Sequence, residues 1–168
     1  MVLAVEIERK FLIRAKPGRA PDRVHKIRQG YIAREGGNTV RVREKDGDYI
    51  LSIKTRNPAG GRNELEYGIA AEEGAVLFSS ISHHAIIKSR EIYELDGHIW
   101  EIDIFAGANK GLIIAEVELG TVDEDVILPD WIGPEVTELS KFYNANIATM
   151  PFESWRISYE ALVERLSG

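Results

Sequence analysis

Charged side chains stand two residues apart near the start of this sequence. The stretch EIERK contains Glu6, Glu8 and Lys10, and apolar residues alternate with them. This alternation predicts a β-strand with one ionic and one apolar face, because successive side chains of a strand point to opposite sides. Carboxylates are oxygen ligands for hard divalent cations, and Lys and Arg bind phosphate oxygens. The ionic face therefore either meets water or encloses a charged ligand.

The same spacing recurs in most of the later extended segments. Some segments carry acidic pairs and others basic pairs, and like charges held this close repel unless counterions or a ligand offset them. A solvated outer face is the ordinary interpretation of any single pair. The inference that the charges face inward therefore depends on the whole set. Its further members are Arg41/Arg43, Ser52/Lys54, Arg62/Glu64/Glu66, Lys88/Arg90, Glu101/Asp103 and Glu116/Glu118.

Eight alternating segments separated by turn residues predict eight strands. The turns EGGN and KDGD are typical of hairpins. Consecutive antiparallel strands favour a mainly β protein with peripheral helices, in which a closed eight-stranded barrel removes exposed sheet edges. The predicted strands cover residues 5–13, 28–35, 38–45, 48–55, 62–69, 85–95, 98–105 and 112–120.

The predicted helices occupy the remaining segments. They are residues 22–27 with Asp22 as N-cap, residues 70–81, a short part of 134–148, and an amphipathic helix that starts at Ser154. We expect this last helix to lie against or plug one end of the barrel. Helices need an apolar surface to pack on, so the apolar strand faces are expected to point outward beneath them. The charges would then line a tunnel.

Composition limits the other possibilities. The 168 residues suit one domain spanning 1–168, and the net charge of -6 argues against nucleic acid or an anionic membrane as a partner. The chain has no cysteine, which excludes disulfides and thiolate metal sites. No apolar run reaches the roughly 18 residues that span a bilayer, and the N-terminus lacks a signal-peptide pattern. We expect a cytoplasmic monomer or homodimer.

The motifs, taken in order, resemble a known family. EIERK matches the E-x-E-x-K signature of the CYTH superfamily, the triphosphate tunnel metalloenzymes, and VRVR, LSIK, RNELEY, IIKSR, WEIDIF and AEVEL follow in family order. The resemblance covers about residues 3–150 and implies an eight-stranded antiparallel barrel with a charged central tunnel. One segment departs from the family pattern, because Leu139 stands where an Asp is usual and Lys141-Phe142 replace Arg-Tyr.

The resemblance also implies roles for the charged residues. The metal-binding acids would be Glu6, Glu8, Asp103, Glu116 and Glu118. The phosphate-binding bases would be Lys10, Arg41, Arg43, Lys54, Lys88 and Arg90. Glu64, Glu66 and Glu101 match acidic positions with a less defined role, either tethering the bases or approaching a second metal. Tyr31 and Lys54 are catalytic candidates near the reacting phosphate, and the alternative is that Tyr31 is a wall aromatic and Lys54 a phosphate clamp.

The implied activity is metal-dependent hydrolysis of a triphosphate, with Mg²⁺ or Mn²⁺ as cofactor. Inorganic triphosphate, cleaved to pyrophosphate and phosphate, is the favoured small-molecule substrate, because no insertion offers a pocket for a nucleoside. A class IV-type adenylate cyclase, a thiamine or nucleoside triphosphatase, and a non-catalytic polyphosphate-binding module are the alternatives. The histidines lack metal-site spacing, so we expect all of them, including His83, to have surface roles.

Overall fold

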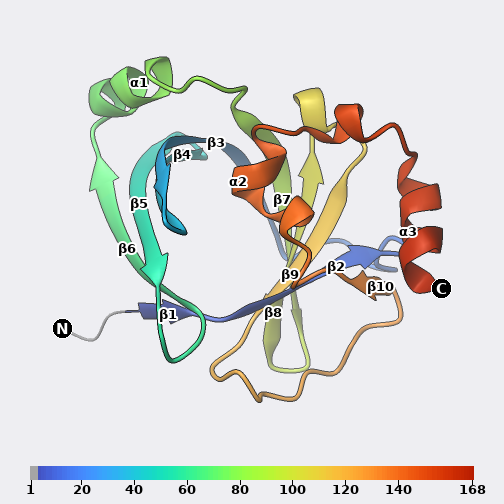
Figure 1. The fold of residues 1–168 in the computed structure, drawn as a ribbon. Helices are drawn as coiled ribbons and strands as arrows, with labels where there is room; N and C mark the ends of the chain where they lie inside the picture. Colours follow the sequence, from blue (N-terminus) through green and yellow to red (C-terminus); the bar gives the residue numbers. More distant parts are fainter. Residues whose placement is uncertain (1–3) are drawn as a thin grey trace.

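The strands of this computed structural model, which describes residues 4–168, form one antiparallel sheet that curls around a central space (Figure 1). The predicted mainly β architecture is confirmed. The sheet has ten strands in the order β1-β6-β5-β4-β3-β7-β8-β9-β2-β10. Their bounds are β1 Ala4–Glu6, β2 Glu8–Ile13, β3 Arg23–Glu35, β4 Asn38–Lys45, β5 Asp48–Arg56, β6 Arg62–Ile69, β7 Ile86–Leu95, β8 His98–Phe105, β9 Ile113–Glu118 and β10 Ile132–Glu135.

Hydrogen bonds do not close the sheet into a complete barrel, which corrects the expectation of full closure. The first predicted strand is divided at Ile7 into β1 and β2. β1 pairs with β6 at one edge of the sheet, whereas β2 pairs with β9 near the other edge. The chain itself therefore crosses from one end of the ladder to the other at Ile7. The first predicted strand thus pairs with β6 before Ile7 and with β9 after it, and with neither along its whole length.

The predicted helix at residues 22–27 is wrong, because this segment begins β3. It pairs with β7 from Arg23 opposite Ile92 to Gln29 opposite Ile86. The side chain of Asp22 accepts a hydrogen bond from the backbone N–H of Glu94 at 2.8 Å instead of capping a helix. Long-range strand pairing thus outweighs the local capping signal.

Three α-helices and three short 3-10 turns complete the structure. They are α1 Ala71–Ser79, α2 Asn144–Ile147 and α3 Tyr159–Ser167, with 3-10 turns η1 Gly107–Asn109, η2 Ser140–Phe142 and η3 Phe152–Trp155. Helix α1 agrees with the prediction. The last helix begins later than expected, because Arg156 adopts a left-handed φ of 53° and the Ser158 hydroxyl caps the helix by accepting from Ala161 N–H at 3.2 Å.

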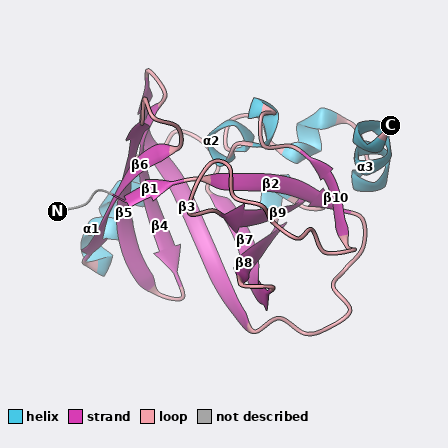
Figure 2. Cartoon of the chain, turned by 90° about the horizontal axis from the view of Figure 1, so that it is seen from below, coloured by secondary structure: helices cyan, strands magenta, loops and turns pink. Residues whose placement is uncertain are grey.

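The C-terminal segment packs over one end of the central space, and the predicted helix lies against this end without plugging it. Phe142, Ile147 and Phe152 come from η2, α2 and η3 and pack against the buried Leu12 and Ile86 of the strands. Helix α3 lies further out, beside β10, and adds Leu162 to the same cluster (Figures 1 and 2). The plug is therefore the irregular segment 142–152, with α3 packed against it.

The outward apolar faces are covered in two different ways. Helix α1 covers β4 and β5, and its Gly74 lies so close to Tyr49 that a Cβ there would be 2.0 Å from the ring. The outer side of β2, β8 and β9 is instead covered by the loop after β9, where Trp131 packs edge-on against Trp100 with ring centroids 5.5 Å apart. Helices therefore cover only part of the outward apolar surface.

No helix within residues 4–168 is long and apolar enough to cross a membrane.

Candidate active site

The register of the sheet brings the predicted ionic residues together on its inner face. Lys10 lies opposite Glu116, and Glu8 lies opposite Glu118. Lys54 lies opposite Glu64 on the other side of the space. The inward direction predicted for the charged pairs therefore agrees with the structure.

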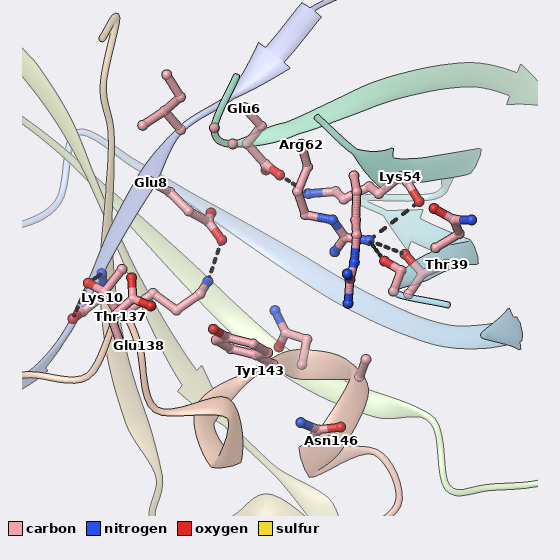
Figure 3. A pocket seen from close by; sticks show the side chains of 18 of the residues that line it. Glu6, Glu8, Lys10, Thr39, Lys54, Arg62, Thr137, Glu138, Tyr143 and Asn146 are labelled. Carbon is pink, nitrogen blue, oxygen red and sulfur yellow. Dashed lines mark hydrogen bonds and ion pairs between the residues drawn. The ribbon is translucent and has the colours of Figure 1, made fainter. Parts of the chain in front are cut away.

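Two connected cavities lie inside this ring. The inner one has a volume of about 140 Å³, and the outer one, about 1230 Å³. Glu6, Glu8, Lys10, Arg41 and Lys54 line both of them. Figure 3 shows Glu8 facing Lys10 and Glu6 facing Lys54, with Tyr143 and Asn146 of the plug segment across from them.

Five buried ionic residues joined by close ion pairs form a set that we call the deep group: Lys10, Lys88, Arg90, Asp103 and Glu116. Asp103 is 0% exposed and accepts from Arg90 Nε at 2.6 Å and from Arg90 Nη2 at 2.7 Å. It also pairs with Lys88. Glu116 joins the two sides of the group, since it pairs with Lys10 at 2.5 Å and with Arg90 at 3.1 Å.

Burial and pairing act in opposition on the pKa values of the deep group. Burial, followed by the nearby Arg90 charge, lowers the pKa of Lys88 to about 8. Burial also opposes ionisation of Glu116, but the charges of Lys10 and Arg90 outweigh it and hold the pKa of Glu116 well below its ordinary value. In Lys10, burial is likewise outweighed by Glu116 and Glu8, which raise the pKa. The members of the deep group stay charged because oppositely charged partners within the group offset the cost of burial.

A second set, the rim group, consists of Glu6, Arg41, Lys54, Glu64 and Glu66. Lys54 pairs with Glu6 and lies 3.3 Å from Glu64. Arg41 lies 3.5 Å from Glu64 and 3.7 Å from Glu66. The Arg41 contacts and the contact between Lys54 and Glu64 are longer than the deep-group contacts to Asp103, whereas Lys54 and Glu6 pair closely, and the Glu66 side chain is 42% exposed. Glu64 and Glu66 tether bases here, in agreement with one of the two roles considered from the sequence.

Tyr31 lines the outer cavity together with Lys54, but the structure does not pair the two within residues 4–168. Burial raises the pKa of Tyr31, against the opposing effect of the Arg41, Arg43 and Lys10 charges. A buried phenol beside several cations is suited to hydrogen-bonding an anion.

The acids that face the inner cavity have the chemistry of a hard-cation site. Burial, followed by Glu6 and Glu101, raises the pKa of Glu118. Such clustered carboxylates are relieved by a divalent cation, so the residues present fit Mg²⁺ or Mn²⁺. Within residues 4–168 no three of them are gathered in metal-binding geometry. Glu6, Glu8, Glu101 and Glu116 instead pair with Lys10, Lys54 or Arg90.

Two predicted residues lie deeper than expected. Lys88 and Asp103 contact Arg90 or each other but are absent from the lining of both cavities. Glu101, a secondary prediction, does line the inner cavity and pairs with Arg90.

Sequence reasoning missed one polar residue that lines the cavities, Asn144, and two that lie on or against β3 near Tyr31, Gln29 and His83. Gln29 is 0% exposed, and neither end of its amide has a partner among residues 4–168. Its place two residues before Tyr31, on the same strand face, was a signal that could have identified it. Asn144 lines both cavities from the plug segment. His83 contacts the Tyr31 backbone and is not merely a surface residue.

The curled antiparallel sheet and the inward acids and bases define a triphosphate tunnel type of protein. The CYTH domain family matches residues 4–149, so the chain belongs to that family, whose tunnel enzymes are metal-dependent. The chain is 34% identical to an inorganic triphosphatase of Acetivibrio thermocellus over 90% of its own length and 97% of the relative. It is 32% identical to an inorganic triphosphatase of Nitrosomonas europaea over 85% and 96% of the two chains.

Solved structures agree with these relatives. The crystal structure of an inorganic triphosphatase matches with a TM-score of 0.65 and 30% identity, over 87% of this chain and 95% of that one. A protein of Pyrococcus furiosus, 19% identical with a TM-score of 0.53 over 70% and 80% of the chains, shows the fold alone. The family predicted from the motifs is confirmed. The single domain over 1–168 stays a prediction.

Proposed function

We propose that this protein hydrolyses inorganic triphosphate to pyrophosphate and phosphate. The observation that carries the proposal is the inner cavity, where Lys10, Arg41, Arg43, Lys54 and Arg90 converge on a space of about 140 Å³ beside a wall of carboxylates. A dense, linear polyanion matches so many converging bases, and both curated relatives are named inorganic triphosphatases.

In this proposal, the bases exchange partners when the substrate binds. Lys10 and Lys54 leave Glu8 and Glu6 for phosphate oxygens, so charge compensation is kept while the carboxylates become available to a cation. Arg43 and Arg41 each have a buried Nε without a partner among residues 4–168, and both nitrogens are donors for the same substrate.

Hydrolysis then joins a water oxygen to the terminal phosphorus and breaks its bond to the bridging oxygen, which leaves with pyrophosphate. A divalent cation held by Glu6, Glu8, Glu101, Glu116 and Glu118 would neutralise phosphate oxygens and lower the pKa of the attacking water. Tyr31 and Lys54 face the reacting phosphate, where Lys54 holds an oxygen or accepts the proton of the water. We assign Asp103 to holding Lys88 and Arg90, since it does not line the cavity.

A nucleoside triphosphate is the second candidate, because the outer cavity of about 1230 Å³ exceeds the space that a bare triphosphate needs. The preference for Mg²⁺ or Mn²⁺, the cytoplasmic location and the oligomeric state stay predictions from the sequence.

The test presents equal concentrations of inorganic triphosphate, ATP, thiamine triphosphate and pyrophosphate to the purified protein, with Mg²⁺, with Mn²⁺ and with EDTA. Products are separated by ion-exchange chromatography. We expect the highest kcat/KM with inorganic triphosphate and complete loss of turnover in EDTA. Cyclic AMP as the main product from ATP would instead identify a cyclase, and binding without turnover of any substrate would identify a binding module.

A further inference from the structure

His83 meets the backbone of Tyr31 where the pairing of β3 with β7 stops. The two strands pair from Arg23 to Gln29, and β7 begins only at Ile86. Beyond Gln29, the connection between α1 and β7 takes the place of the strand. The Tyr31 backbone therefore contacts a side chain, whereas the residues of β3 up to Gln29 pair with β7.

The hydrogen bonds of His83 fix the orientation of its ring. Tyr31 N–H donates to Nε2 of His83 over 3.1 Å. Nδ1 lies 2.8 Å from the carbonyl oxygen of His84, and Nε2 also lies 3.3 Å from the carbonyl oxygen of Tyr31. Because the Tyr31 N–H can only donate, the shorter contact needs an accepting Nε2, and we assign the proton to Nδ1. The ring is thus held between the Tyr31 N–H and the His84 carbonyl, and it supports the backbone at Tyr31.

The adjacent backbone has the features of a segment that aims a side chain. The register of β3 with β4 shifts between Tyr31 and Ala33, and such bulges redirect the side chains beside them. Gly30 allows the connection to approach, since a Cβ there would lie 2.7 Å from Cδ1 of Ile81 and 3.7 Å from Cε1 of His83. The contact therefore depends on a glycine, a bulge and an imidazole that meet at one point.

We propose that His83 is the positioning residue for Tyr31, holding the bulged backbone so that the phenol points into the cavity beside Arg41. The inference rests on the proposed function, in which Tyr31 faces the reacting phosphate. His83 touches neither substrate nor cation. Its effect reaches the reaction only through the place of the Tyr31 ring.

The first experiment compares His83→Leu, His83→Gln and the neighbouring control His84→Leu, whose native side chain is exposed. Leu cannot accept the Tyr31 N–H, whereas the Gln amide oxygen reaches the position of Nε2. We expect His83→Leu to lower kcat for inorganic triphosphate by about tenfold or more, with KM within about twofold, because small displacements of a positioned group are costly. His83→Gln should recover most of the loss, and His84→Leu should match the wild type.

A double-mutant cycle with Tyr31→Phe separates positioning from general destabilisation. If His83 acts through the phenol, His83→Leu adds little to the loss already caused by Tyr31→Phe. Additive losses, or full activity of His83→Leu, would overturn the inference while leaving the proposed function intact. Absence of triphosphate hydrolysis by the wild type would overturn the proposed function, and the positioning inference with it. Folding of each variant is checked by its thermal unfolding midpoint and by amide hydrogen exchange at Tyr31, which we expect to quicken in His83→Leu alone.

Discussion

The deep group and the rim group contain the same kinds of side chain but are held in different ways. In the deep group, Asp103 is fully buried and bonds to two bases, with Arg90 contacts of 2.6 and 2.7 Å. In the rim group, Arg41 reaches Glu64 and Glu66 only at 3.5 and 3.7 Å, and Glu66 is 42% exposed. Arg41 is as buried as the bases of the deep group, so the two groups differ in the distance and solvation of the carboxylates that these bases meet.

This difference assigns separate tasks to two parts of one ionic ring. The deep group fixes the relative positions of β2, β7, β8 and β9, because its contacts cross all four strands. The rim group lies on β1, β4, β5 and β6, where the loose contacts of Arg41 with Glu64 and Glu66 can be exchanged for a ligand. A site that binds a polyanion needs both a firm frame and exchangeable partners.

The sharpest test of the comparison replaces one acid in each group. Asp103→Asn removes the carboxylate that pairs with Lys88 and one of the three that pair with Arg90, and we expect the free energy of unfolding to fall by about 3–5 kcal/mol. Glu64→Gln removes a looser, partly solvated partner, and we expect a fall below about 1 kcal/mol. Urea unfolding followed by tryptophan fluorescence measures both. Equal losses in the two variants would contradict the division into a frame and an exchangeable rim.

A smaller effect on the free energy of unfolding is expected at Tyr159, which hydrogen-bonds the C-terminal segment to the sheet. The Tyr159 hydroxyl accepts from Ile13 N–H at 2.8 Å and donates to the carbonyl of Ile13 or Ile113, each 3.1 Å away. Tyr159→Phe leaves a backbone N–H unpaired, so we expect a loss of about 1–2 kcal/mol in the free energy of unfolding.

The stability lost in Tyr159→Phe is expected to change with pH in one direction. Burial raises the pKa of Tyr159 to about 12, above the ordinary value of 10.0. The unfolded chain thus releases the phenol proton first, and the contribution of Tyr159 is complete below pH 10 and lost as the pH rises toward 12. The difference between wild type and Tyr159→Phe should therefore narrow in alkaline urea titrations. A difference that stays constant from pH 8 to pH 11 would show that the hydroxyl is not buried in solution.

The smallest effect on stability is expected at Glu118. Burial and the surrounding carboxylates raise the pKa of this residue, and no cation pairs with it among residues 4–168. We expect Glu118→Gln to change the free energy of unfolding by less than about 0.5 kcal/mol. The variant should nevertheless lose most of the thermal stabilisation that Mn²⁺ gives together with triphosphate. The exposed Glu153→Gln is the matched control, and equal stabilisation of both variants would remove Glu118 from the cation site.

The sequence predicted which residues face inward, because strand alternation is a local property. It did not predict which acid meets which base. That depends on register between strands far apart in the chain, as for Lys10 and Glu116. The start of β3 was missed for the same reason, since Asp22 offers a helix cap locally while the pairing partner lies on β7.

Local sequence patterns also did not predict which segments cover the outer face of the sheet. The sequence placed the apolar faces outward, but it did not show that the loop carrying Trp131 covers one side of the sheet. His83 gave no signal, because its importance comes from the place where β7 ends relative to Tyr31. The family resemblance supplied the residue roles, and these stay predictions. Asp103 lines neither cavity, which is why we propose a holding role for it.

The N-terminal segment changes its pairing partner at Ile7. It therefore joins the two ends of the sheet and also contributes residues to the site. Release of residues 4–13 would uncover the free edges of β6 and β9 at the same moment. Free edges pair readily with the strands of other molecules. The same release withdraws Glu6, Glu8 and Lys10 from the cavity. Detachment of this strand would therefore convert an enzyme into a template for intermolecular strand exchange, so that inactivation and self-association of the chain begin as a single event.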